Sequence, residues 1–137
     1  MQKNWQINHL GFVVRDMDKA MNYYKKLGIA EIGPEKMMEA YDGSKIKVRF
    51  VKIGSLLLEF FEPPEGAGVS GKYLQEHGEG VNHLSFTVTD IEQEIEQLVG
   101  QGMKLMFRSE DRDFGQVAYF DTSDVAGVVM ELVQAPT

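Results

Sequence analysis

The feature that most constrains this chain is an internal repeat. Residues 8–16 (NHLGFVVRD) recur 74 positions later as residues 82–90 (NHLSFTVTD). The register continues without a gap over 21 positions, seven of which carry identical residues. A second match, at an offset of 72, aligns residues 55–64 with residues 127–136. A repeated sequence indicates a repeated structural unit, so we expect one module used twice.

The apolar periodicity predicts the same order of elements in both copies: a strand, a helix and then three strands. Asp16 and Asp90 stand where helix N-caps are expected, and Gly28 follows the first helix as a C′ residue. The first copy is expected to have strands at about 7–14, 29–38, 46–53 and 56–62 and a helix at 17–27. The second is expected to have strands at 81–88, 103–107, 116–120 and 128–133, a helix at 91–100 and a charged loop at 108–115.

The predicted fold class is α+β, with two tandem βαβββ modules in a single domain spanning residues 1–137. The first module covers about residues 5–64 and the second about residues 80–135. A Pro- and Gly-rich linker covers residues 63–68, and the stretch 65–79 between the modules contains the end of this linker and a short helix. Each half has roughly 60 to 70 residues, near the lower limit for independent folding, so the halves should share a sheet or a core.

Composition excludes several classes of function. The chain has no cysteine, which rules out disulfides, thiolate metal sites and a catalytic Cys. Its net charge of -7 argues against sequence-independent nucleic-acid binding, which depends on basic surface. No apolar run approaches the roughly 20 residues needed to span a membrane, and the N-terminus does not resemble a signal peptide. We therefore expect a cytoplasmic protein that binds neither nucleic acid nor membrane.

Four residues at repeat-matched positions are candidate metal ligands. His9 and His83 lie near the start of each copy, on the strand face that otherwise carries small side chains. Glu59 and Glu131 lie near the end of each copy, each surrounded by apolar neighbours. A buried ionised carboxylate is costly unless it is paired or coordinates a metal. Two His and two Glu form an N/O ligand set suited to a divalent ion.

Each of these residues also has a plainer interpretation. A single strand His is more often hydrogen-bonded for structure than a ligand, and a single strand Glu can face solvent at an edge. The matched occurrence of all four favours the metal site. His77 has no repeat partner and is expected at the surface. The basic face formed by Lys45, Lys47 and Arg49 is expected to be solvated, since an anion site there has weaker support.

The pattern resembles the vicinal oxygen chelate superfamily, which includes glyoxalase I, methylmalonyl-CoA epimerase, extradiol dioxygenases, fosfomycin-resistance enzymes and bleomycin-binding proteins. The resemblance covers about residues 5–134. It implies that the modules form a curved mixed sheet around a metal cleft. It also implies that one divalent ion (Zn, Ni, Co, Mn or Fe) is bound, because the four candidate ligands fall on the family's ligand positions.

Within the superfamily, the chain is most similar to the methylmalonyl-CoA epimerases. The stretch Gly78 to His83 (GEGVNH) resembles their Gly-Glu-Gly-hydrophobic-His-His motif. It departs from them at Glu59, where epimerases carry Gln, and at Gly43, where they carry a catalytic Glu. Glu39 and Asp42 are nearby acids that could replace the acid missing at Gly43.

The resemblance implies a metal-dependent isomerase, epimerase or lyase that transfers a proton alpha to a carbonyl. The substrate would be a CoA thioester or a hemithioacetal. Glu131 would serve as ligand and base, with Glu59 as the alternative base. Because Gly43 replaces the second acid, epimerisation of methylmalonyl-CoA itself is expected to be weak or absent.

Two other functions compete with this one. An Fe(II)-dependent dioxygenase would use His9, His83 and Glu131 as a facial triad. A non-catalytic drug-binding resistance protein is the other alternative, but such proteins generally lack the full ligand set. The resemblance also implies a homodimer, and the sequence leaves open whether the site is completed within one chain or between two.

Overall fold

The computed structural model describes residues 2–40, 42–111 and 115–136. By packing, the chain divides into two compact units. Unit 1 consists of residues 1–9 and 82–137, and unit 2 consists of residues 10–81. The predicted modules would instead divide the chain near residues 64 and 80. The module boundaries follow the sequence repeat, whereas the units follow packing. The module boundaries and the assignment of a single domain therefore stay predictions.

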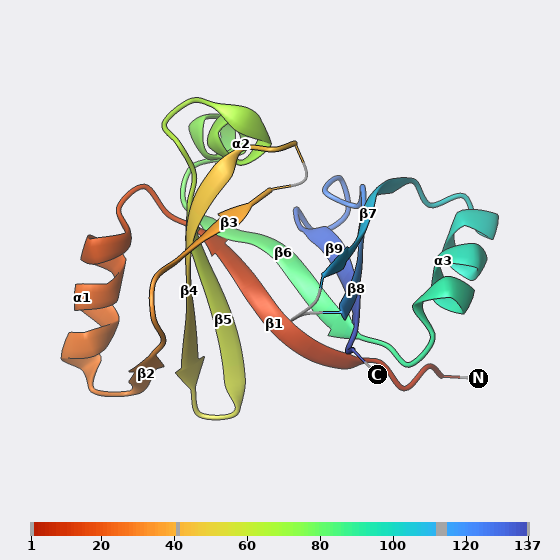
Figure 1. Ribbon diagram of the computed structural model, residues 1–137, viewed down its shortest axis with the longest axis horizontal. Helices are drawn as coiled ribbons and strands as arrows, with labels where there is room; N and C mark the ends of the chain where they lie inside the picture. Colours follow the sequence, from red (N-terminus) through yellow and green to blue (C-terminus); the bar gives the residue numbers. More distant parts are fainter. Residues whose placement is uncertain (1, 41, 112–114, 137) are drawn as a thin grey trace. The chain divides into compact units, whose positions relative to one another are not determined.

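Unit 2 contains most of the first copy of the repeat and the short helix that follows it (Figure 1). Its sheet has the order β2-β4-β5-β1, with β3 also pairing with β4. The parallel β1–β5 pair makes this sheet mixed. The elements are β1 (Gln6–Val13, shared with unit 1), α1 (Met17–Leu27), β2 (Ala30–Ile32), β3 (Lys36–Glu39), β4 (Lys45–Ile53), β5 (Leu56–Glu62) and α2 (Gly68–His77).

Two apolar clusters lie on opposite faces of this sheet, because alternate residues of a strand point to opposite sides. On one face, Met17 and Met21 of α1 pack with Val51 of β4 and with Leu58 and Phe60 of β5. On the other, Leu74 of α2 belongs to a cluster with buried residues of β1, β4 and β5. The apolar spacing that predicts α1 from the sequence is therefore the spacing that buries it.

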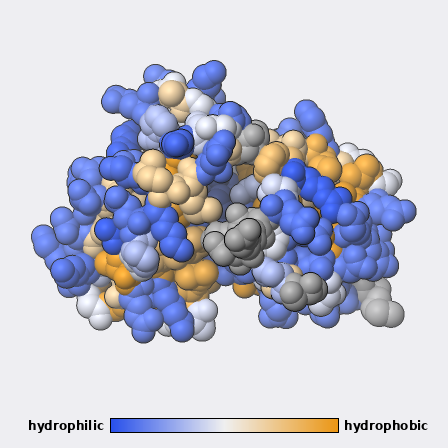
Figure 2. Space-filling model, in the orientation of Figure 1, coloured by the Kyte–Doolittle hydropathy of each residue, from blue (hydrophilic) through white to orange (hydrophobic). Residues whose placement is uncertain are grey.

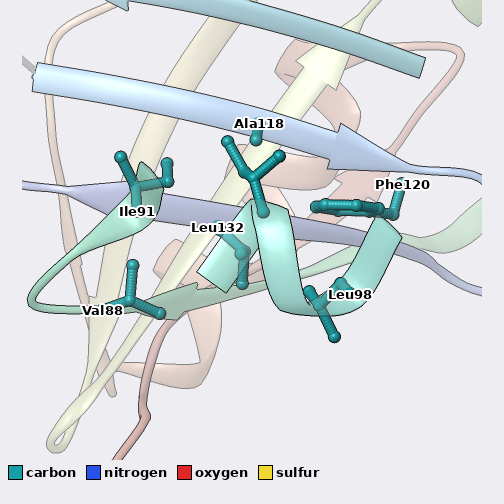
Figure 3. Close-up of a cluster of buried hydrophobic side chains, with 7 residues drawn as sticks. Val88, Ile91, Leu98, Ala118, Phe120 and Leu132 are labelled. Atoms are coloured by element: carbon teal, nitrogen blue, oxygen red, sulfur yellow. The ribbon is translucent and has the colours of Figure 1, made fainter. Parts of the chain in front are cut away.

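Unit 1 contains most of the second copy, with the sheet order β6-β9-β8-β7. Its core forms where α3 covers β8 and β9 (Figure 3). The elements are β6 (Gly80–Thr87, whose first two residues belong to unit 2), α3 (Ile91–Gly100), β7 (Leu105–Asp111), β8 (Gly115–Phe120) and β9 (Val129–Gln134). The buried side chains are Val88, Ile91, Ile95, Leu98, Ala118, Phe120 and Leu132.

The strand registers confirm the repeat. In unit 2, Gly11 of β1 pairs with Glu59 of β5 in a parallel ladder. In unit 1, Ser85 of β6 pairs with Glu131 of β9, also in a parallel ladder. Each Glu therefore lies at the same place in its module, on the sheet face opposite the module's first helix. The predicted α+β class and the strand–helix–three-strand order are confirmed. The one difference in order is that the strand expected at residues 29–38 forms two short strands, β2 and β3.

The starts of α1 and α3 are held in the same way. Asp16 and Asp90 are the N-caps, as predicted, and each accepts a hydrogen bond from the backbone three residues later. In addition, a side chain at the end of each module's last strand accepts a hydrogen bond from the first residue of that module's helix. The Glu62 carboxylate accepts from the Met17 backbone N–H at 2.8 Å, and Gln134 Oε1 accepts from the Ile91 N–H at 2.8 Å. The capping scheme repeats along with the sequence.

One boundary prediction was wrong. Residues 108–111 belong to β7 rather than to a charged loop, because Arg108, Ser109 and Glu110 pair with β8. Charged side chains are tolerated there because β7 is the last strand of its sheet, where they discourage pairing with other chains. Gly115, the last residue of the predicted loop, begins β8, and residues 112–114 lie outside the described residues.

The surface carries a few exposed apolar side chains. In unit 2, Leu27, Ile29 and Leu56 are exposed, and Figure 2 shows apolar surface over β2 and the β4–β5 hairpin. The basic face of β4 is engaged in structural contacts. Lys47 Nζ lies 3.4 Å from a carboxylate oxygen of Glu62, and Arg49 donates to the Gly33 carbonyl at 3.0 Å. Among the described residues, no helix combines the length and apolar character that crossing a membrane requires.

Candidate metal centre

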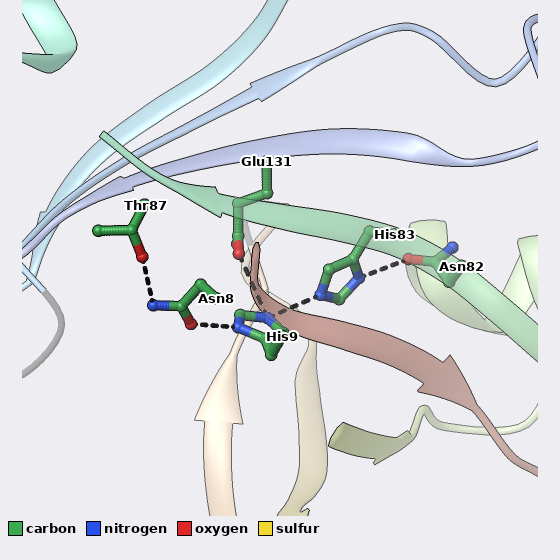
Figure 4. A network of polar contacts seen from close by, with 6 residues as sticks. All are labelled: Asn8, His9, Asn82, His83, Thr87 and Glu131. Carbon is green, nitrogen blue, oxygen red and sulfur yellow. Dashed lines mark hydrogen bonds and ion pairs between the residues drawn. The ribbon is translucent and has the colours of Figure 1, made fainter. Parts of the chain in front are cut away.

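Three of the four predicted ligands come together in unit 1. His9, His83 and Glu131 are each 4 to 5% exposed, and they offer ligand atoms that all lie within 4.8 Å of one another. The two Nε2 atoms of the histidines are 3.2 Å apart, and His9 Nε2 lies 3.3 Å from Glu131 Oε1 (Figure 4). Residues that are 48 to 122 positions apart in the chain thus converge on one buried point.

Strand geometry explains this convergence. His83 and Ser85 share one face of β6, and Glu131 occupies the same face of β9 because parallel partners point the same way. The opposite face of this sheet packs against α3 through Leu132. The site therefore lies on the face that the unit's own helix leaves uncovered.

Each His is oriented by the Asn that precedes it. His9 Nδ1 lies 2.7 Å from Asn8 Oδ1, and His83 Nδ1 lies 3.0 Å from Asn82 Oδ1. The Asn8 amide is fixed in turn, since its Nδ2 donates to Thr87 Oγ1 at 3.0 Å. An amide oxygen only accepts, so each Nδ1 carries a proton, and the Nε2 of a neutral ring is then an acceptor.

The donor set fits a divalent cation. Two acceptor nitrogens 3.2 Å apart repel each other unless a proton or a cation lies between them. Glu131 Oε1 is fully buried and has no hydrogen-bond partner among the described residues, although it lies close to His9. Bonds of about 2.0–2.2 Å to one ion would put neighbouring donors roughly 3.0–3.5 Å apart, which matches the separations observed here.

Glu59, the fourth predicted ligand, lies in unit 2 on β5 and is half-buried. It faces Gly11 across the β1–β5 ladder and Phe50 across the β4–β5 ladder. Its place in the module matches that of Glu131, but its part in binding a metal stays a prediction.

The two acids near Gly43 differ in their surroundings. The Asp42 carboxylate accepts from the Ser44 hydroxyl at 2.6 Å and from the Val69 backbone N–H at 2.7 Å. These hydrogen bonds, the one from the Ser44 side chain foremost, hold the pKa of Asp42 below its ordinary value. Asp42 thus joins the β3–β4 turn to the start of α2. A side chain on Gly43 would begin 3.8 Å from Glu39 Oε1, so the Glu39 carboxylate lies next to that position.

Sequence reasoning missed the two Asn residues and Tyr119. The Asn residues were visible as identical residues next to each His of the repeat. The ring of Tyr119, which pairs with Glu131 across the β8–β9 ladder, lies edge-on to the His83 ring at 6.3 Å. His77 is exposed and stacks on Tyr73, as expected for a surface His.

The family model for the glyoxalase/bleomycin resistance protein/dioxygenase superfamily matches residues 8–120, which is most of the chain. The chain belongs to this superfamily. The match confirms the predicted resemblance.

Among curated proteins, this chain is 25% identical over 132 residues to an uncharacterised protein, YqjC, of Bacillus subtilis. The match covers 94% of this chain and 91% of YqjC. This chain is also 26% identical over 135 residues to the mitochondrial methylmalonyl-CoA epimerase of Bos taurus, covering 95% of this chain and 74% of that one.

Among solved structures, the hypothetical protein BH1468 of Bacillus halodurans matches with a TM-score of 0.83 at 22% identity, over 98% of this chain and 97% of that one. The methylmalonyl-CoA epimerase of Mycobacterium tuberculosis matches with a TM-score of 0.79 at 21% identity, over 96% and 88%. At these identities, the structural matches establish the fold alone.

Proposed function

We propose that this protein is a divalent-metal-dependent enzyme that transfers a proton on the carbon alpha to the carbonyl of a CoA thioester. The observation that carries the proposal is the buried convergence of His9, His83 and Glu131. The thioester class is supported by relatives named methylmalonyl-CoA epimerase and by a solved epimerase in complex with methylmalonyl-CoA.

His9, His83 and Glu131 would hold the ion, with Glu59 as the fourth ligand on the strength of its matched position. A bound divalent ion supplies Lewis acidity toward a substrate carbonyl, which makes the neighbouring C–H bond more acidic. Asn8 and Asn82 keep both imidazoles in the tautomer that leaves Nε2 available. The apolar core behind β9 excludes water from the face of the sheet that carries no ligands.

Glu131 is the proposed base, and Glu59 is the alternative. A buried carboxylate oxygen such as Glu131 Oε1, which accepts no hydrogen bond from the described residues, has little to give up before it accepts a proton from carbon. Inversion of a stereocentre needs a second group on the other side of the substrate. Asp42 is committed to Ser44 and Val69, so Glu39 is the candidate for that role. Without an acid at position 43, methylmalonyl-CoA epimerisation is proposed to be weak or absent.

Incubation of the metal-loaded protein in deuterated water tests the proposal. Methylmalonyl-CoA, simpler acyl-CoA thioesters and a hemithioacetal would be compared by mass spectrometry and by chiral analysis. The expected result is metal-dependent uptake of deuterium into at least one thioester, with little racemisation of methylmalonyl-CoA. Absence of exchange in all substrates would refute the proposal. Rapid exchange with full racemisation would restore the epimerase, and Glu39→Gln would then be the first variant to make.

A second candidate function follows from the number of converging ligands. Two His and one carboxylate form the facial triad of Fe(II) oxygenases, and the group that converges in unit 1 has that composition. If the protein is a dioxygenase, Fe(II) but not Zn or Co should support oxygen consumption with a catechol-like substrate. Proton exchange without oxygen uptake would favour the first proposal.

A further inference from the structure

Ser85 is the buried residue nearest to Glu131 along the β6–β9 ladder. It is fully buried, with 0% of its surface exposed. The two residues are direct partners in the parallel register, so their side chains leave the sheet on the same face. Ser85 Oγ and Glu131 Oε1 are both buried atoms without a hydrogen-bond partner among the described residues. A donor and an acceptor are therefore both unsatisfied on neighbouring strands.

This situation is costly in a folded protein. An unsatisfied buried polar group costs about 1–3 kcal/mol, and native structures contain few of them without a functional reason. The repeat shows that the fold does not require the hydroxyl. The matching position in the first module is Gly11, which pairs with Glu59. The hydroxyl is thus found beside only one of the two matched carboxylates.

We infer that Ser85 is a positioning residue for Glu131, donating a hydrogen bond to its carboxylate when Glu131 binds a divalent cation. A carboxylate can bind an ion with one lone pair and accept a hydrogen bond with another. A serine hydroxyl rotates freely to suit its partner, and ligating carboxylates are commonly hydrogen-bonded in turn. The inference rests on the proposed metal centre and distinguishes Glu131 from Glu59 within it.

If Ser85 has this role, replacing it should affect the stability of the metal-free protein and the affinity for metal in opposite directions. In the metal-free protein, Ser85→Ala removes an unsatisfied hydroxyl, so the melting temperature should stay the same or rise. In the metal-bound protein, the same change removes a contact to a ligand, so affinity should fall. A residue that only supports the strand would lower the stability of both forms together.

The experiment uses Co²⁺ alone as the probe, on the full chain and on Ser85→Ala. Ser109→Ala is the matched control, because it removes a serine hydroxyl from β7, two strands away from β9. We expect the Kd for Co²⁺ to rise about 10- to 100-fold in Ser85→Ala and to stay unchanged in Ser109→Ala. At saturation, the visible absorption bands of Co²⁺ should also change in Ser85→Ala, because Glu131 would coordinate with a different geometry.

A smaller rise in Kd, unaltered bands, or a loss of affinity accompanied by a lower melting temperature of the metal-free Ser85→Ala protein would overturn the inference. If the unmodified protein binds no Co²⁺, the proposed metal-dependent function fails and the inference falls with it. If the unmodified protein binds Co²⁺ and Ser85→Ala binds it equally well, only the inference fails.

Discussion

At the scale of single residues, the Asn-His pairs determine what the site can do. An imidazole has two nitrogens, and only one can face a ligand without a proton. In both copies, the Oδ1 of the preceding Asn is hydrogen-bonded to Nδ1, so Nε2 is the nitrogen that faces the other ligands. Because each Asn directly precedes its His, the orientation of each ring is determined by two consecutive residues of the sequence.

Replacing His83 with Ala should abolish stoichiometric metal binding. The change removes one of two nitrogen donors and leaves only His9 and Glu131 of the group that converges in unit 1. Metal analysis of protein purified without added ions would measure the ratio of metal to chain. His77→Ala is the matched control, because His77 is the third His and is exposed. Full metal content in the His83→Ala protein would show that the assignment is wrong.

Replacing Asn82 with Ala should weaken metal binding without abolishing it. Loss of a group that orients a ligating His typically lowers affinity 10- to 100-fold. Titration with Co²⁺ would measure the change, and Asn8→Ala should behave similarly. Asn22→Ala, at an exposed position of α1, serves as the control. Equal affinities in all three variants would mean that the Asn–His contacts do not hold the rings for a metal.

At the scale of elements, the sequence predicted the type and order of nearly every helix and strand, because apolar spacing and buried faces coincide. The strand from Leu56 to Glu62 was predicted to the residue. What failed was β7, where charged residues concealed a strand that exists through its pairing with β8. The contacts of Glu62 and Gln134 with the helix starts were also out of reach, because they join residues more than 40 positions apart.

The same distinction applies to the site. Four ligand-type residues could be selected from the sequence because the repeat marked them twice. Ser85 could not, because its repeat partner is Gly11 and a serine in a strand has no special pattern. Ser85 becomes a candidate because it is buried and pairs with Glu131, and both facts require a three-dimensional structure.

The contact between the β3–β4 turn and α2 should make stability depend on pH. Asp42 has a lowered pKa in the folded protein because Ser44 and the Val69 N–H donate to it. Its contribution is therefore present above the ordinary pKa of 3.8 and is lost as the pH falls through the lower, folded value. Because the carboxylate is exposed, the contribution should not exceed about 1 kcal/mol.

Chemical denaturation of Asp42→Ala and of the unmodified chain would test this from pH 7 down to about pH 3. The variant should be less stable at neutral pH, and the difference should shrink as the solution becomes more acidic. Asp124→Ala, at an exposed loop position, should show no such difference. A stability difference that stays constant with pH would contradict the proposed role of the Asp42 charge.

At the scale of the whole molecule, we predict a homodimer, on the basis of the resemblance to the superfamily. Trp5, a bulky residue before the first strand, packs against Phe86 within unit 1, with Lys3 over its ring. It is therefore already covered in part by its own chain. Light scattering at micromolar concentration would measure the mass, and a monomer would contradict the prediction.

Unit 1 is assembled from residues 1–9 and 82–137, which lie on either side of unit 2 in the sequence. On a ribosome, His9 is therefore made well before Glu131, which follows 122 residues later. At about 5–20 residues per second, this is a delay of about 6–24 s. Unit 2 is synthesised in full during that interval, and the three ligands can meet only after Glu131 has been made. The complete ligand set would thus be available to a cation only once β9 exists, and a nascent chain stalled before β9 would hold two histidines without their carboxylate.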